Sequence, residues 1–266
     1  MCMSIREKLS RITGLKQTVL CVGLDADAAL LPEGFGHTPG DVVAFNREII
    51  NATRHVAAAY KINTAFYEQY GSRGWAALEA TRTLLPDDAI SIADAKRGDI
   101  GNTNNAYART FYQTLDFDSA TVSPYLGFDS IETFLQYPDK LTFALALTSN
   151  IGSADFQRLD VGGKPLYRKV IERCCEYRGA GEIGFVVGAT HPSDLAEIRS
   201  YTKSVLLIPG VGTQGGAPDE VLAANGGESA LVNVSRQIIY ASSGADFAER
   251  ARENAEKFAA QLRIIA

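Results

Sequence analysis

Short apolar runs rich in β-branched residues recur along the chain at intervals of a few tens of residues. A polar or glycine-containing loop and then an amphipathic segment follow each run, and this alternation is typical of repeated βα units. The predicted strands are Val19–Gly23, Val56–Ile62, Ala89–Ala93, Ala120–Val122, Thr142–Leu147, Gly184–Gly188, Val205–Pro209 and Ala230–Val234. About eight parallel strands suit an α/β fold of the closed (β/α)8 TIM barrel type, although a doubly wound open sheet has the same local rhythm.

The amphipathic segments between these runs have the spacing of helices. The predicted helices are Asp41–Arg54, Trp75–Leu85, Asn104–Leu115, Ser130–Gln136, Leu166–Tyr177, Ser193–Tyr201 and Ala245–Ile265. No Pro/Ser-rich linker divides the chain, so a single barrel domain over residues 1–266 is expected. Two long loops, Asp25–Gly40 and Ser149–Lys164, directly follow strands, and long loops in a compact domain tend to carry function.

Composition narrows the class of protein. The 266 residues are 46% hydrophobic and carry a net charge of −5, with no block of Lys or Arg that would track a nucleic acid backbone. No stretch is apolar enough to cross a membrane, and the charged start between Arg6 and Lys16 does not resemble a secretory signal. A cytoplasmic globular protein that binds neither a nucleic acid polymer nor a membrane is therefore expected.

Cysteine and histidine positions do not predict a metal site. Cys174 and Cys175 are neighbours in a helical pattern, while Cys2 and Cys21 have no metal-ligand spacing to them. The three histidines, His37, His55 and His191, are far apart in the sequence. We expect reduced structural thiols and surface or structural histidines.

Charged residues follow the first three predicted strands, where a parallel barrel places its reactive groups. Asp25 follows the first, Lys61 and Asn63 end the second, and the third leads into Asp94-Ala-Lys96-Arg-Gly-Asp99. Residues i and i+2 of a strand share a face, so Asp94 and Lys96 are expected to face the barrel mouth. If Asp94 and Lys96 were the only charged residues there, a salt bridge at the rim of the barrel would be the simpler interpretation. Lys61 and Asp99 favour a reactive cluster instead. Beside carboxylates, Lys96 is expected to stay protonated, so that it can donate a proton.

A phosphate site is predicted after the last two strands. The glycine-rich run Pro209-Gly-Val-Gly-Thr-Gln214-Gly-Gly216 follows the seventh strand, and Ser235-Arg236 follows the eighth. Backbone N–H groups of such turns, with an arginine nearby, bind phosphate at this position in many barrels. The glycines alone would be weak evidence, because they also serve tight turns.

The segment Asp94-Ala-Lys96-Arg-Gly-Asp99-Ile-Gly-Asn-Thr103 resembles the Asp-x-Lys-x-x-Asp signature of the orotidine 5′-phosphate decarboxylase family, in the longer bacterial (type 2) form. The resemblance extends over most of the chain. In chain order it includes Asp25, Lys61-Ile-Asn63, Leu147-Thr-Ser149-Asn150, Pro209–Gly216 and Arg236. It implies decarboxylation of orotidine 5′-monophosphate to uridine 5′-monophosphate, the last step of de novo UMP synthesis, without a cofactor or metal.

The resemblance also implies a role for each matching residue. Lys96 would protonate C6 of the pyrimidine, Asp94 would lie beside the substrate carboxylate, and Lys61 would link the charged network to the ribose. In the family a homodimer is formed, in which Asp99, with Thr103 close behind, completes the partner's site. The implied substrate-binding residues are Asp25 at the ribose, Ser149 at the pyrimidine, Gln214 and Arg236 at the phosphate, and also Asn63, Pro209 and Ser235.

Two positions depart from the family pattern, and two rival functions stay open. Ile62 and Ile151 stand where proline is expected, which affects the local path of the second and fifth loops rather than a reacting group. A metal-dependent sugar-phosphate decarboxylase or aldolase would be expected to carry a carboxylate in place of Lys61. A non-catalytic nucleotide-phosphate-binding barrel would need Gln214 and Arg236 but not the charged third-strand motif.

Overall fold

The structure, a computed structural model, describes residues 3–189, 192–211 and 216–264. Strands β1 to β8 follow one another in sequence order around a closed barrel. The pairs β1–β2, β2–β3, β4–β5, β5–β6 and β6–β7 are parallel. The predicted (β/α)8 barrel is therefore confirmed, and the open doubly wound sheet is wrong.

The chain packs as two compact units. Unit 1 contains Met1–Ser10 and Lys96–Val232, and unit 2 contains Arg11–Ala95 and Asn233–Ala266. The divisions fall inside secondary-structure elements rather than in linkers. The divided elements are α1 (Ile5–Lys16), β3 (Ile90–Arg97) and β8 (Ala230–Val234).

The register of the first three strands brings Asp25, Lys61 and Asp94 close together, although these strands end at different heights. Along β1 (Leu20–Gly23) and β2 (Ala59–Asn63), Gly23 pairs with Lys61. Along β2 and β3, Asn63 pairs with Asp94. The second strand begins later than Val56, where it was predicted, because Val56 and Ala57 donate their N–H groups to the carbonyl of Thr53 in a turn that ends the preceding helix.

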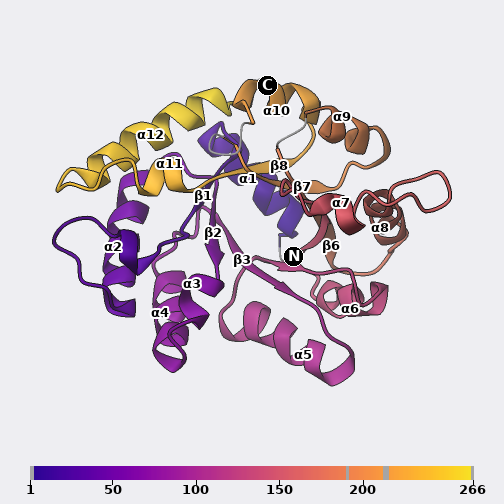
Figure 1. Ribbon diagram of the computed structural model, residues 1–266, viewed down its shortest axis with the longest axis horizontal. Helices are drawn as coiled ribbons and strands as arrows, with labels where there is room; N and C mark the ends of the chain where they lie inside the picture. Colours follow the sequence, from indigo (N-terminus) through magenta and orange to yellow (C-terminus); the bar gives the residue numbers. More distant parts are fainter. Residues whose placement is uncertain (1–2, 190–191, 212–215, 265–266) are drawn as a thin grey trace. The chain divides into compact units, whose positions relative to one another are not determined.

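The helices of unit 2 pack around one long helix, α2 (Pro39–Thr53), which contacts both α4 (Ser72–Thr83) and α12 (Phe247–Gln261) (Figure 1). A capping box between Thr38 and Asp41 begins α2, which satisfies N–H groups that a helix start leaves unpaired. The short helices of this unit are α3 (Ala65–Glu68), α11 (Arg236–Ile239) and the 3-10 turn Ala28–Leu30. Between these elements, the buried ring of Phe45 stacks on Tyr240 and Phe247, and Phe35 meets Phe45 and Phe247 edge to face.

The strands of unit 1 pair in sequence order and are almost entirely buried. They are β4 (Ser119–Val122), β5 (Leu141–Leu147), β6 (Glu182–Val187) and β7 (Val205–Pro209). Thr121 pairs with Phe143, and Gly184 pairs with Val205. A side chain at Gly184 would come within 2.6 Å of the Val205 carbonyl oxygen, so this position requires glycine.

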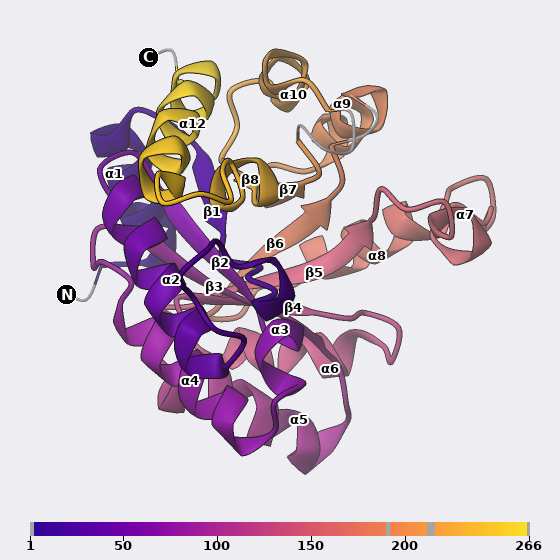
Figure 2. The same ribbon diagram turned by 60° about the vertical axis from the view of Figure 1, so that its left-hand side comes forward.

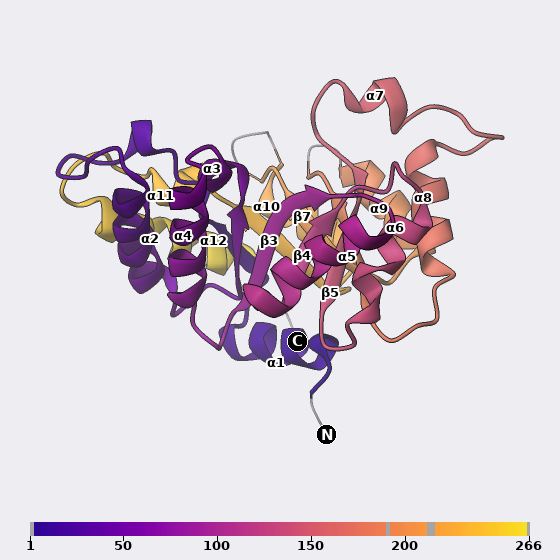
Figure 3. The same cartoon turned by 90° about the horizontal axis from the view of Figure 1, so that it is seen from below.

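The helices of unit 1 follow these strands in alternation. They are α5 (Gly101–Arg109), which continues as the π-helical turn Thr110–Thr114, then α6 (Phe128–Glu132), the 3-10 turn Phe134–Gln136, α7 (Ser153–Phe156), α8 (Leu166–Cys175), α9 (Pro192–Tyr201) and α10 (Pro218–Asn225). Figure 2 shows α9 packed beside α10. In Figure 3 the loop that carries α7 extends away from the strands of its unit.

Five of the described α-helices were not predicted: the longer α1 and α10, and the four-residue α3, α7 and α11. Ile5, Leu9 and Ile12 of α1 are buried, with the spacing of one helix face. Proline at the start of α10 and the left-handed Gly226 at its end, with φ +63°, are ordinary helix boundaries. The last predicted helix, Ala245–Ile265, is shorter in the structure, and Ile265 lies outside the described residues.

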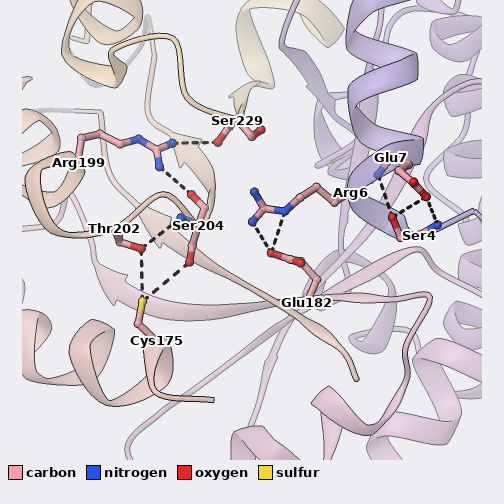
Figure 4. Close-up of polar contacts among 9 residues, drawn as sticks. All are labelled: Ser4, Arg6, Glu7, Cys175, Glu182, Arg199, Thr202, Ser204 and Ser229. Atoms are coloured by element: carbon pink, nitrogen blue, oxygen red, sulfur yellow. Dashed lines mark hydrogen bonds and ion pairs between the residues drawn. The ribbon is translucent and has the colours of Figure 1, made fainter. Parts of the chain in front are cut away.

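The amino ends of the strands in unit 1 are tied together by polar side chains (Figure 4). The Arg199 guanidinium donates to the carbonyls of Ser204 and Ser229 at 2.7 and 2.9 Å and to Oδ1 of Asn225 at 2.6 and 2.8 Å. Burial lowers the pKa of Arg199 to about 10. Arg6 of α1 pairs with Glu182 at the start of β6. Since barrel enzymes react at the opposite end of the strands, we assign this cluster to stability.

Arg199→Met should lower the free energy of unfolding by about 2 kcal/mol, because it leaves Asn225 and two carbonyl groups without their donor. Lys203→Met is the matched control, since its side chain is 84% exposed and pairs with Glu228 only at 3.5 Å. It should change stability by less than about 0.5 kcal/mol. Urea denaturation followed by circular dichroism measures both, and equal losses would contradict the assignment.

Candidate active site

Three charged side chains meet at the carboxyl ends of the strands in unit 2. The Lys61 ammonium donates to Oδ1 of Asp25 at 2.9 Å and to Oδ2 of Asp94 at 3.1 Å. The side chains of Lys61 and Asp94 are only 5% and 11% exposed. Of the charged residues expected to converge, the structure brings Lys61 and Asp94 together and adds Asp25 to them. We call these three residues the Lys61 cluster.

The backbone of β1 and β2 sets the geometry of the Lys61 cluster. Leu24 donates its N–H to the Lys61 carbonyl at 2.8 Å, which fixes the chain just before Asp25. A Cβ at Gly23 would lie 2.7 Å from the Cβ of Ser235, so only glycine lets the end of β1 approach the residue that follows β8. Ser235 also donates its hydroxyl to the Gly23 carbonyl at 3.0 Å. The positions of the strand ends are therefore fixed by backbone as well as by charge.

Lys61 keeps its proton in this environment. Burial by itself would lower its pKa, but the charges of Asp25 and Asp94 outweigh that effect and raise the pKa above its ordinary value. Two carboxylates and one ammonium then leave one net negative charge. The arrangement attracts a cationic or hydrogen-bond-donating group and disfavours a second anion beside Asp94.

Lys96 lies two residues after Asp94 on β3 and belongs to unit 1. Its side chain is exposed, and its φ of +47° is in the left-handed region. The prediction that Asp94 and Lys96 both face the barrel mouth assumed an extended strand, whereas the backbone at Lys96 is left-handed. That the two side chains share a face stays a prediction. The Lys96 N–H donates to the hydroxyl of Thr121 at 2.9 Å.

Asp99 and Thr103 lie at the start of α5 in unit 1. The Asp99 carboxylate accepts the N–H of Ile100 at 2.8 Å. Thr103 is exposed in the first turn of the helix, and Ile100 is 61% exposed. These residues therefore present polar and apolar groups on the surface of unit 1.

The remaining predicted site residues also lie at or just after the carboxyl ends of strands. In unit 2, Asn63 accepts the N–H of Ala65 at 3.1 Å and so begins α3, while the exposed Arg236 begins α11. In unit 1, Ser149 follows β5 and Pro209 ends β7. Gln214, predicted at the phosphate, lies outside the described residues, as do Cys2 and His191.

Sequence reasoning missed two polar residues that organise strand ends in unit 1. One is Thr121, the acceptor for Lys96, and the other is Gln157 of the loop after β5. Gln157 accepts the Thr148 N–H at 2.7 Å and donates to the Thr148 hydroxyl at 2.9 Å. Neither position carried a signal in the chain, because each acts on a residue that is distant in the sequence or on a loop backbone.

The described part of the chain also bears on the prediction for its cysteines and metal ligands. There, no group of three or more His, Cys, Asp or Glu side chains is placed to hold a metal ion. The described cysteines are free, and burial raises the pKa of Cys21 and brings that of Cys174 to about 12, so both stay as thiols. Of the helices in residues 3–189, 192–211 and 216–264, none has the length and apolar character to cross a membrane.

Known proteins match this chain over nearly its whole length. It is 47% identical over 248 residues to orotidine 5′-phosphate decarboxylase of Flavobacterium johnsoniae, covering 91% of each chain. It is 48% identical over 263 residues to the protein of that name from Dehalococcoides mccartyi, covering 96% of each. The solved structure of Leishmania donovani OMP decarboxylase is similar with a TM-score of 0.84 and 38% identity, covering 97% of this chain and 99% of that one.

The sequence profile of the orotidine 5′-phosphate decarboxylase/HUMPS family matches residues 18–251. That range includes every residue of the Lys61 cluster, the whole Asp94–Thr103 motif and Arg236. The resemblance inferred from the strand-end motifs is confirmed: the chain belongs to the orotidine 5′-phosphate decarboxylase/HUMPS family.

Proposed function

We propose that this chain removes the carboxylate of orotidine 5′-monophosphate to give uridine 5′-monophosphate and carbon dioxide, the last step of de novo UMP synthesis. Relatives that share 47% and 48% of its residues are named for this carboxy-lyase activity. The observation that carries the proposal is the buried ammonium of Lys61 between two carboxylates, with Lys96 two residues beyond Asp94. The longer bacterial form of the family stays a prediction.

The reaction breaks the bond between C6 of the pyrimidine and its carboxylate and leaves the electron pair on C6. No adjacent carbonyl receives that pair, so a fitting catalyst holds fixed positive charge where the carbanion develops. We assign this role to Lys96, whose ammonium transfers a proton to C6 as carbon dioxide leaves. Asp94 lies beside the substrate carboxylate in this proposal, where like charge disfavours the bound ground state.

The other site residues hold the nucleotide. Lys61 links the charged cluster to the ribose, Asp25 accepts hydrogen bonds from the ribose hydroxyls, and Ser149 contacts the edge of the pyrimidine. Phosphate binding falls to Gln214 and Arg236, with Asn63, Pro209 and Ser235 completing the substrate-binding set. Binding energy gained at the phosphate offsets the cost of placing an anionic substrate beside Asp94.

A homodimer is the proposed working form, with Asp99 and Thr103 entering the partner's site. Large apolar side chains on the surface of unit 1 support it: Tyr125 is 80% exposed, Leu126 52%, Ile151 97% and Phe156 58%. Tyr125 and Phe156 contact each other, with ring centroids 6.3 Å apart. Apolar surface of this kind marks interfaces. Leu126 lies near Gly98, next to Asp99, which connects this surface to the residues assigned to the partner's site.

The two rival functions fit the described residues less well. A metal-dependent sugar-phosphate decarboxylase needs an oxygen ligand where this chain has Lys61. The Lys61 ammonium has no lone pair to give to a metal, and it already binds one oxygen each of Asp25 and Asp94. A non-catalytic nucleotide-phosphate-binding barrel would use Gln214 and Arg236 but has no need of the Asp94, Lys96 and Asp99 motif. A cofactor-free reaction, a cytoplasmic location and a single domain over residues 1–266 stay predictions.

The purified protein should convert orotidine 5′-monophosphate to uridine 5′-monophosphate in the presence of a chelator. The reason is that every group assigned to the chemistry is a side chain of the protein. The loss of ultraviolet absorbance of the substrate follows the reaction. Turnover that stops in the chelator and returns with a divalent cation would favour the metal-dependent rival, and absence of turnover in both conditions would favour the binding barrel.

Lys96→Ala should abolish turnover by removing both the proton donor and the positive charge at C6, while the unfolding midpoint stays near that of the wild type. Lys257→Ala, at an exposed lysine of α12, is the matched control and should retain full activity. Initial rates at saturating substrate measure the effect. Near-normal turnover of the Lys96 variant would show that Lys96 is not the proton donor.

Mixing the inactive Asp99→Ala and Lys96→Ala proteins should restore activity through hybrid dimers. If subunits exchange freely, half of the dimers are hybrids with one intact site each, so about a quarter of the wild-type activity is expected. Native mass spectrometry of two variants that differ in mass, for example by a tag on one of them, checks that the subunits exchange between dimers. Exchange without any recovery of turnover would show that Asp99 does not act in the partner's site.

A further inference from the structure

The backbone at Lys96 is held in a conformation that the residue does not favour. Its φ of +47° lies in the left-handed region, where a Cβ crowds the following carbonyl oxygen. Residues with side chains adopt this conformation at a cost in free energy, so surrounding contacts must impose it. Those contacts come from β4 and α5, all within unit 1.

Two hydrogen bonds from the β4 segment bracket Lys96. The hydroxyl of Thr121 accepts the Lys96 N–H at 2.9 Å, and the N–H of Ser123 donates to the Arg97 carbonyl at 2.7 Å. Thr121 is 1% exposed, so its hydroxyl is fixed by the core. A side-chain oxygen takes the N–H of Lys96, and the strand can therefore turn at this residue while its polar group stays satisfied.

The residues after Lys96 are held as well. The Arg97 guanidinium lies over the rings of Tyr107 and Phe111, at 5.3 and 5.7 Å from their centroids. At Gly98, a Cβ would lie 3.1 Å from the Ser123 carbonyl oxygen, so the chain passes close to β4 there. The chain is thus constrained on both sides of Lys96, and the Thr121 side chain holds the backbone of Lys96 itself.

We propose that Thr121 is a positioning residue for the reaction. Its hydroxyl holds the Lys96 backbone in the left-handed conformation and so fixes the position from which the Lys96 side chain extends toward C6 of the substrate. This inference rests on the proposed role of Lys96 as proton donor. Because Thr121 acts through the backbone of the donor and on no group assigned to the nucleotide, its loss lowers kcat and leaves KM almost unchanged.

The test compares Thr121→Val, which keeps the shape but removes the acceptor, with Thr121→Ser, which keeps the acceptor. Thr142→Val is the matched control: Thr142 is also fully buried, on the neighbouring strand β5, and its hydroxyl contacts the Tyr112 phenol at 3.0 Å. Thr121→Val should lower kcat on the order of 10-fold, with KM and the affinity for uridine 5′-monophosphate within about 2-fold of wild type. Thr121→Ser and Thr142→Val should keep kcat within about 2-fold.

Equal kcat for Thr121→Val and Thr142→Val overturns the inference, and so does an equal loss in Thr121→Ser and Thr121→Val. If Thr121→Val does not fold, Thr121→Cys replaces it, since a thiol is a weaker acceptor of similar size to the serine hydroxyl. Equal kcat of the Cys and Ser variants then overturns the inference. Normal turnover of Lys96→Ala, by contrast, rejects the proton-donor assignment, so the two failures give different results.

Discussion

The ion pairs that Lys61 makes with Asp25 and Asp94 are the interaction on which the rest of this site depends. An ammonium and two carboxylates that are nearly removed from water are costly unless each finds an opposite charge in good geometry. That geometry exists only if β1, β2 and β3 keep their register, because each charged residue comes from a different strand end. The cluster therefore makes the strand register and the electrostatics of unit 2 depend on each other.

Such a cluster is suited to chemistry because its charges do not have to reorganise. Water around a free lysine must reorient when charge moves during a reaction, whereas side chains fixed by a packed core are already in place. The raised pKa of Lys61 keeps the central positive charge in place at neutral pH. A site that must disfavour one anion, the substrate carboxylate, while it binds another, the phosphate, needs charges held at defined places rather than a diffuse positive field.

The sequence was sufficient for the barrel and for the Lys61 cluster because both depend on local patterns. Core strands are short apolar runs, and the residues that end them fall at one edge of a parallel sheet, so Asp25, Lys61 and Asp94 could be placed together. The left-handed turn at Lys96 could not be predicted, because its N–H partner lies 25 residues later on β4. Similarly, Gln157 organises a loop through contacts with Thr148 that follow no strand or helix period.

The two ends of the strands in unit 1 use polar groups in different ways. At the amino ends, Arg199 donates to carbonyl and amide oxygens and Lys8 pairs with Asp118 at 2.5 Å, so polar side chains tie neighbouring segments together. At the end of β3, by contrast, a hydrogen bond sustains a backbone conformation that is itself unfavourable. Among the described residues other than glycine, Gln17, Lys96 and Asp116 have a left-handed φ. Gln17 and Asp116 precede strands, whereas Lys96 lies at the carboxyl end of one, where the strained backbone sets the starting point of the side chain assigned to proton transfer.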